Sequence, residues 1–443
     1  MKLFFIIASL FIAQLSFGQD VVNQTTPKVW TLNDCLVYAV ENNITIKDAS
    51  LDKEQAEVDY DATKSSRLPN LFGSTSQSFS NGNAIDPITS DFVNAQIYST
   101  NASLNSNMTL YQGNQINNQI AQSELLKNQF LFLEEVAKND IIVSILENYL
   151  QILYAKEGIT IAENNLITSE KEVAQAKARL DAGSIALSDY TEAQSQAATN
   201  RFAVITAKNT YQQNIITLKQ LLELDPTENI EIETLSNDID YVTIELDKMT
   251  IYNKALGIMP EVNASKIAVE VREKELDIVK GAYLPTLSLS SSLVSGYTSV
   301  NDATFTDQFN INISERVGLS LTIPIFNRNQ TKAAVKTAEL NIEKAQISEQ
   351  TTIKEVYKKV ETAYQNALST QEQLIASEAS KIAAEQSYKL AQKKYDLGGL
   401  STTDLVLSQN TYTNAQQNYL QAKYLSVLYH QLLQFYQGND IKL

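Results

Sequence analysis

The sequence predicts an α+β membrane protein built from two copies of one structural unit. The two copies are marked by a helix–turn–helix pattern from Arg179 to Asp189 that recurs about 215 residues later, from Lys394 to Asp404, with the same spacing between its Gly and its Asp. Four segments with alternating apolar and polar residues predict strands, and two long stretches without proline predict helices. A duplication of this length indicates one architectural unit used twice.

The first 18 residues predict a secretory signal peptide. Lys2 precedes an apolar run from Leu3 to Leu15, and Ser16 to Gly18 supply the small residues of a cleavage site. The apolar run is shorter than the roughly 20 residues that a membrane-spanning helix needs. We therefore expect an exported chain.

Composition excludes several classes of function. The net charge is −16, and it becomes −17 when Lys2 is removed with the signal peptide, so nucleic acid is excluded as a partner. The single cysteine, Cys35, cannot form an internal disulfide and is predicted to be a buried structural thiol. His430 is the only histidine and has no second ligand or catalytic partner. The sequence thus predicts no catalytic residue, no metal site and no cofactor.

Each predicted repeat begins with a helix and continues into two strands. The first repeat spans residues 19–240, with a helix over 32–67 and strands near 71–80 and 96–111; the second spans 241–443, with a helix over 248–282 and strands near 286–298 and 309–326. Polar loops over 81–91 and 300–308 join the strands of each pair. In the last two segments the odd positions are apolar and oppose serine, asparagine and threonine, which is the pattern of strands with one apolar face.

A long helical hairpin completes each repeat. Residues 114–180 and 330–397 have no proline, almost no glycine, and much Ala, Gln, Glu, Lys and Leu. At 1.5 Å per residue each helix would be roughly 100 Å long, which requires an extended coiled-coil bundle. Returning helices over 188–224 and 403–436 pack antiparallel to them. The acidic segment 225–247 predicts an irregular linker outside the bundle.

An exported chain with such strands favours a membrane β-barrel over a soluble sandwich. The apolar strand faces have no partner sheet in the rest of the chain, and aromatic residues gather near the strand ends, as in the girdles of membrane barrels. These residues are Tyr98, Tyr111, Tyr297, Phe305, Phe309 and Phe326. Four strands cannot close a barrel, so the chain must oligomerise. A dimer would supply eight strands, whereas a trimer would supply twelve and leave room for an aqueous lumen.

Nearly the whole mature chain resembles the TolC-like outer membrane efflux proteins. The most specific features are the two duplicated turns, Gly183 to Asp189 and Gly398 to Asp404, which match the helical hairpin tips of that family. The other matching residues are Thr31-Leu32, Ala39, Asn42-Asn43, Pro69, Ala255, Pro260-Glu261, Pro285 and Pro324 to Asn327.

The resemblance implies a homotrimer in the outer membrane of a Gram-negative bacterium. Three chains would form a twelve-stranded barrel in the lipid and a twelve-helix tunnel in the periplasm, a passive exit duct that docks with a periplasmic adaptor protein and an inner membrane pump. The implied docking and gating residues are Arg179, Gly183, Ser184, Ile185, Ala186, Leu187, Ser188, Asp189, Lys394, Gly398, Gly399, Leu400, Ser401, Thr402, Thr403 and Asp404. A type I protein secretion duct is an alternative, and a structural coiled-coil envelope protein is an alternative of another class.

The aperture residues are not carried over from the family. Lys389 stands about where some members place an aspartate ring, so that gate is not expected here. Asp181 and Asp396, each two residues before a tip glycine, are the nearest substitutes and would give two rings of three carboxylates if they line the pore. Their alternative role is that of solvated surface carboxylates. The sequence leaves the cargo open among drugs, metal ions and proteins.

Overall fold

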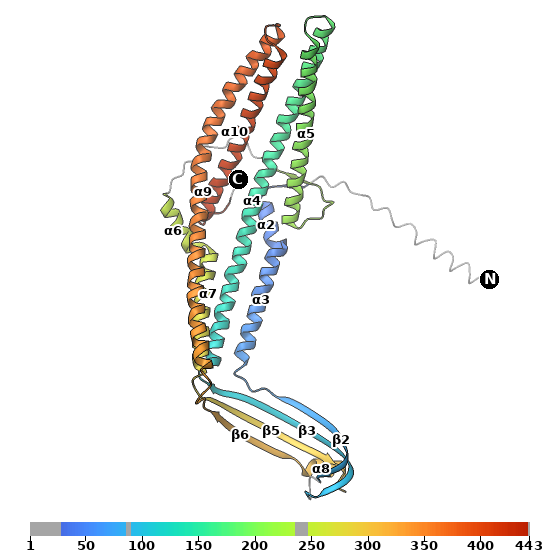
Figure 1. Ribbon diagram of the computed structural model, residues 1–443, viewed down its shortest axis with the longest axis vertical. Helices are drawn as coiled ribbons and strands as arrows, with labels where there is room; N and C mark the ends of the chain where they lie inside the picture. The colour runs from blue at the N-terminus through green and yellow to red at the C-terminus, as the bar shows by residue number, and fades with distance from the viewer. Residues whose placement is uncertain (1–27, 86–89, 235–246, 442–443) are drawn as a thin grey trace, which may run out of the picture.

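Two helical hairpins lie side by side at one end of the molecule and a four-stranded sheet lies at the other (Figure 1). The computed structural model describes residues 28–85, 90–234 and 247–441. The predicted signal peptide and residues 86–89 of the predicted loop lie outside these ranges. No helix in the described ranges is both long enough and apolar enough to cross a membrane.

The order of elements in the first half of the chain recurs in the second half. The first half contains α2 (Leu32–Asn42), α3 (Ile44–Ser65), β2 (Phe72–Ile85), β3 (Phe92–Gln112), α4 (Gln115–Asp181) and α5 (Leu187–Leu222). The second half contains α6 (Lys248–Ile258), α7 (Pro260–Gly281), β5 (Thr286–Thr298), α8 (Phe305–Ile311), β6 (Ser314–Thr322), α9 (Gln330–Asp396) and α10 (Thr402–Tyr436). The four hairpin helices are as predicted to within two residues at each end. Helices α4 and α9 each have 67 residues.

The single helices predicted over 32–67 and 248–282 are each two helices. Asn43 leaves the helical conformation (φ −60°, ψ 131°), and its side-chain oxygen accepts a hydrogen bond from Thr45 N at 2.9 Å. Its side-chain nitrogen donates to Leu221 O at 2.9 Å, which ties the break to α5. In the second half Met259 is extended because it precedes Pro260. Pro260 marks the second break in the sequence, whereas the first break has no proline or glycine near it.

The four long strands form one open antiparallel sheet in the order β2-β3-β5-β6. Strands β2 and β3 extend further than predicted and pair from Phe72 with Asn105 to Ile85 with Phe92. Among the described residues, no strand pairs with the outer edge of β2 or of β6. The sheet therefore ends in two free edges.

The strand predicted over 309–326 is wrong at its beginning, because α8 occupies 305–311. Thr304 caps α8 by accepting a hydrogen bond from Asp307 N at 3.2 Å. The buried amide of Gln308 donates to Thr298 O and accepts from Thr298 N, both at 3.0 Å. These two bonds replace the pairing with β6, which β5 lacks beyond Val294. The residues around 309 therefore form a helix although they alternate as a strand does.

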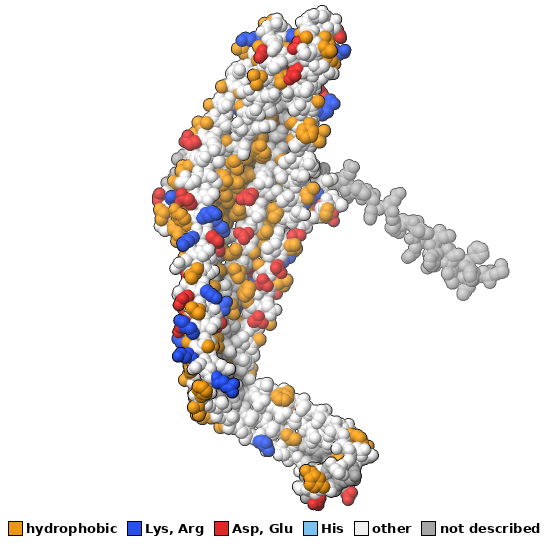
Figure 2. Space-filling view, viewed as in Figure 1, with side chains coloured by type: hydrophobic (Ala, Val, Ile, Leu, Met, Phe, Trp, Pro, Cys, Tyr) orange, Lys and Arg blue, Asp and Glu red, His pale blue; other side chains and the backbone are white. Residues whose placement is uncertain are grey.

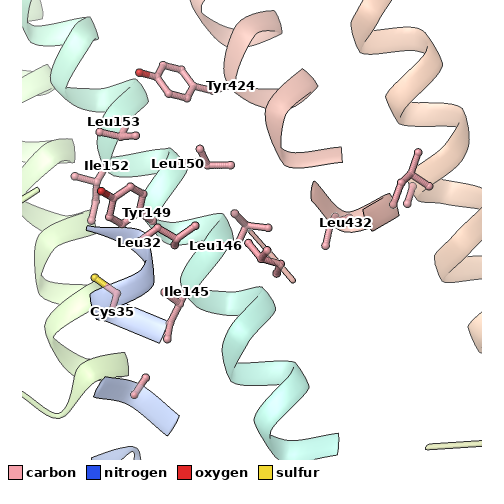
Figure 3. Packing of buried hydrophobic residues seen from close by; sticks show 14 of the residues in the cluster. Leu32, Cys35, Ile145, Leu146, Tyr149, Leu150, Ile152, Leu153, Tyr424 and Leu432 are labelled. Carbon is pink, nitrogen blue, oxygen red and sulfur yellow. The ribbon is translucent and has the colours of Figure 1, made fainter. Parts of the chain in front are cut away.

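The hydrophobic core lies where the two halves of the molecule meet. Ile145, Ile152 and Leu153 of α4 are fully buried, and Cys35 of α2 lies close to them, as Figure 3 shows. Burial of the Cys35 thiol confirms the predicted structural role. The linker predicted outside the bundle contains β4 (Ile230–Ile232), which pairs in parallel with β1 (Lys28–Trp30) and contributes Ile232 to this core. The prediction was therefore wrong for that part of the linker.

A close backbone contact joins the sheet to the helices. Gly113, between β3 and α4, has a φ of +56°, and Gly281 ends α7 just before β5. A Cβ atom added at Gly281 would lie 2.6 Å from Gly113 O and 2.5 Å from Gln115 Cγ. We call Gly113, Gly281 and Gln115 the elbow. Only glycine fits at both of its backbone positions.

Candidate functional site

The two hairpin tips have the same backbone geometry. At the first tip Gly183 has a φ of 72°, and its N–H donates to Leu180 O at 2.8 Å, while Ser184 N donates to Arg179 O at 2.8 Å. This pair of bonds is the Schellman motif that ends many helices. Gly398 has a φ of 75° and begins the same pair of bonds at the second tip. The turns predicted from the duplicated motif are confirmed.

Both predicted tip aspartates cap the helices that return from the tips. Asp189 accepts a hydrogen bond from Ala186 N at 3.3 Å. Asp404 N donates to the hydroxyl of Ser401 at 3.1 Å, and this hydroxyl donates to the Asp404 carboxylate at 2.7 Å. The Asp189 carboxylate thus accepts a backbone hydrogen bond at the start of a helix, and the Asp404 carboxylate accepts a hydrogen bond from the hydroxyl that caps the other helix. Negative charge at these helix ends is also favoured by the helix dipole. Their local role is thus established independently of any binding role.

A groove between the two tips contains many of the predicted docking residues. The predicted residues that line it are Arg179, Ser184, Ile185, Ala186, Asp189, Asp396, Gly398, Gly399, Leu400, Ser401 and Thr402. Gly183, Leu187, Ser188, Lys394, Thr403, Asp404 and Asp181 do not line it. Tyr395 and Leu397 also line the groove; both lie within the duplicated motif but were not among the predicted docking residues.

Contacts from α4 to the end of α9 hold the two tips together. Arg179 Nη2 donates to Asp396 O at 2.9 Å, and its guanidinium lies 4.6 Å from the ring centre of Tyr395. Gln175 Nε2 donates to the Asp396 carboxylate at 3.0 Å. The Asp181 carboxylate is exposed and lies 3.7 Å from Lys177 Nζ of its own helix. The two predicted aperture carboxylates therefore have different surroundings.

A buried carboxyl group links the same two helices further from the tips. Tyr388 OH donates to Glu172 Oε1 at 3.3 Å. Burial raises the pKa of Glu172 to about 7, the Tyr388 hydrogen bond opposes this rise, and the charge of Asp396 adds to it. Burial also raises the pKa of Tyr388, which keeps its hydroxyl protonated. This pair was not predicted from the sequence, although both residues lie about ten positions before a tip glycine.

Replacing Glu172 with glutamine is expected to remove a pH dependence from the contact between α4 and α9. Because the folded-state pKa of Glu172 lies above its ordinary value of 4.5, its protonated form stabilises the contact, and this stability is lost as the pH rises through about 7. Hydrogen exchange at the tip ends of α4 and α9, corrected for intrinsic rates, should therefore be faster at about pH 8 than at about pH 5 in the wild type. An equal response in Glu172→Gln would contradict this assignment.

One face of the sheet is apolar and exposed in the single chain. Val317 of β6 is 73% exposed, and Leu319 and Leu321 on the same face are also exposed. The register places Leu104 of β3 opposite Leu293 of β5 on this face. No second sheet covers these side chains among the described residues. Such a face needs an apolar environment, either lipid or another protein.

Aromatic side chains lie at both ends of this apolar face. At the end far from the helices, Phe79 and Tyr98 have ring centres 4.9 Å apart, and Phe305 lies between Tyr297 and Phe309 at 5.3 and 5.1 Å. The predicted aromatic residues at the helical end, Tyr111 and Phe326, are exposed. This distribution matches the girdles of outer membrane barrels. No cluster of three His, Cys, Asp or Glu residues that could hold a metal occurs in the part of the chain that the structure describes.

Known proteins share both the sequence pattern and the fold. The family model described as Outer membrane efflux protein matches residues 36–223 and 251–436. Outer membrane efflux protein BepC of Brucella suis biovar 1 (strain 1330) is 23% identical over 404 residues, which cover 89% of this chain and 82% of BepC.

Solved structures extend the likeness to the whole fold. The Campylobacter jejuni CmeC outer membrane channel superposes with a TM-score of 0.81 at 19% identity, covering 93% of this chain and 87% of CmeC. A crystal structure of CusC gives a TM-score of 0.80 at 18% identity and covers 96% of each chain.

The sheet and the two hairpins have the fold of outer membrane channel proteins. The chain belongs to the outer membrane efflux protein family, which confirms the resemblance found in its sequence. It is an efflux channel component of a Gram-negative outer membrane and not an enzyme.

Proposed function

We propose that three copies of this chain form a closed duct that carries cargo passively out of the periplasm. The observation that carries the proposal is the open four-stranded sheet, with one apolar face and two free edges. In lipid every strand edge must be paired, and four strands cannot close on themselves. Pairing β6 of one copy with β2 of the next closes the sheet, and three copies give twelve strands with room for a lumen.

The helices extend this duct away from the membrane. Each chain contributes two helical hairpins whose long helices are the next elements after β3 and β6, so three chains supply twelve helices around one axis. In the single chain, α3, α4, α7 and α9 follow the same order as the strands to which they connect. A ring of strands thus continues into a ring of helices. The duct has no chemistry to catalyse, and an inner membrane pump would supply both energy and cargo.

The groove between the tips is the proposed docking site for a periplasmic adaptor protein. Ile185 and Leu400 are half-buried in this groove and offer apolar contacts to an incoming helical tip. The Gly183 and Gly398 turns hold them in place. The Arg179 contact between the hairpins makes the same region suitable as a gate. A type I secretion duct would use these tips in the same way, so the cargo class depends on the pump.

We propose different roles for the two predicted aperture carboxylates, Asp181 and Asp396. Asp181 is exposed at the tip and would add a ring of three negative charges in the trimer. Asp396 accepts a hydrogen bond from Gln175, so its carboxylate serves the contact between the two hairpins. Mutual repulsion of the Asp181 ring would favour a wide aperture that attracts cations.

Photo-crosslinking in cells tests the docking site. A photoreactive residue at Ile185 or Leu400 is expected to capture a periplasmic adaptor, identified by mass spectrometry. The same probe at Leu51, an exposed position on α3 far from the tips, is the control and should not capture it. Capture of the adaptor from Leu51 alone, or from none of the three positions while the protein is assembled in the outer membrane, would overturn the docking assignment.

A further inference from the structure

Charged residues are almost absent from the sheet. Strands β2, β3 and β5 contain no Asp, Glu, Lys or Arg, and β6 contains only Glu315 and Arg316. The visible face of the sheet is accordingly mostly white in Figure 2. Because consecutive strand residues point to opposite faces, these two charges lie on different sides of the sheet.

The strand register assigns Arg316 to the polar face. Arg316 is opposite Ser292 of β5, and Ser292 is opposite Asn105 of β3. Two residues further along β6 on the same face, Gly318 is opposite Ser290 of β5. A Cβ atom at Gly318 would lie 3.5 Å from Ser290 Oγ, so the Ser290 hydroxyl is on this face too. Glu315 instead lies on the face of the exposed leucines. The polar face is therefore built of hydroxyl and amide groups with one guanidinium.

Nothing in the described part of the chain neutralises this guanidinium. No ion pair and no side-chain hydrogen bond there involves Arg316, which is exposed. In the proposed trimer, β6 pairs with β2 of the next copy, and neither β2 nor the adjacent β3 has a carboxylate. An arginine side chain stays protonated under all physiological conditions. Its charge is therefore available to solutes that pass along the polar face.

We propose that Arg316 sets the charge preference of the barrel lumen and favours permeants that carry an anionic group. This inference rests on the proposed trimeric duct, in which the polar face lines the lumen and three Arg316 side chains form one ring. At about 0.1 M salt the Debye length is about 10 Å, so three charges on the wall of a twelve-stranded barrel influence most of its cross-section. The ring opposes the negative charge of the rest of the chain and lies where cargo leaves the duct.

Reversal potentials in planar bilayers test the inference with a matched pair of neighbouring substitutions. Under a KCl gradient around 0.1 M, Arg316→Gln is expected to lower the chloride-to-potassium permeability ratio about threefold, and the difference should vanish near 1 M salt. Arg316→Lys should keep the wild-type ratio. Glu315→Gln, which removes a charge of opposite sign on the other face, should leave it unchanged.

The outcomes separate this inference from the proposed function. Wild-type trimers that conduct ions, with Arg316→Gln trimers that show the same permeability ratio, would overturn the role of Arg316 and leave the duct intact. An equal shift in Glu315→Gln would also overturn it, because the effect would then not depend on the polar face. Wild-type protein that forms no conducting pore would contradict the duct itself.

Discussion

Replacing Gly281 with alanine is expected to abolish assembly of the channel in the outer membrane. The new Cβ atom would lie 2.6 Å from Gly113 O, well inside van der Waals contact, and the obstacle is backbone that cannot rotate away. Relief requires α7 to separate from the start of α4, which changes the angle between the sheet and the helices. Overpacking of this kind costs about 1–3 kcal/mol and sometimes more, and every copy in the proposed trimer would carry the altered elbow.

The matched control for the elbow is Gly158→Ala. Gly158 lies inside α4, and a Cβ atom there would meet nothing within 4 Å. Alanine at this position should leave assembly intact and stabilise the helix by up to about 1 kcal/mol. The measurement is the amount of folded oligomer in purified outer membranes. Equal amounts for Gly281→Ala and Gly158→Ala would show that the elbow is not needed for assembly.

Introducing aspartate at both Ile185 and Leu400 is expected to uncouple the channel from the proposed adaptor protein without reducing the amount of channel in the outer membrane. Both side chains are half-buried in the groove between the tips, so a docked partner would have to desolvate two carboxylates. Leaving a charge buried and unpaired at an interface costs about 2–5 kcal/mol. Association with the adaptor should fall by at least about tenfold, as measured by co-purification of the crosslink-identified protein.

A conservative pair of substitutions controls for this second result. Ile185→Val and Leu400→Ile keep the groove apolar and should preserve adaptor binding. Neither aspartate substitution touches the Gly183 or Gly398 turn, so oligomer yield should match the wild type. Full adaptor binding by the aspartate variant would show that the groove is not the docking surface.

Periodicity and duplication were sufficient to predict most of this fold. The absence of proline between residues 114 and 180 and between 330 and 397 predicted the two 67-residue helices. The matching Gly183 and Gly398 turns were predictable because a Schellman motif needs glycine and because the pattern occurs twice. Both kinds of signal are local in the sequence, which is why one chain alone reveals them.

The features that escaped prediction depend on contacts between distant segments. Gly281 meets Gly113 only after α7 and α4 are placed side by side, and Glu172 meets Tyr388 only when α4 and α9 are in register. Helix α8 is stabilised by the two hydrogen bonds between the Gln308 side chain and the backbone of Thr298. The N–H and C=O of Thr298 can take this partner only because β6 does not extend far enough to pair with them. None of these relations is visible in a hydrophobic pattern.

Electron cryomicroscopy of the intact protein extracted from the outer membrane would show directly whether three copies close into one barrel. We expect a threefold-symmetric particle in which β6 of each copy pairs with β2 of the next, closing a twelve-stranded barrel above a twelve-helix tunnel. The exposed apolar row from Val317 to Leu321 should face detergent, and Arg316 should face the lumen. A monomer with free sheet edges, a closed ring of another number of copies, or an inward-facing apolar row would contradict it.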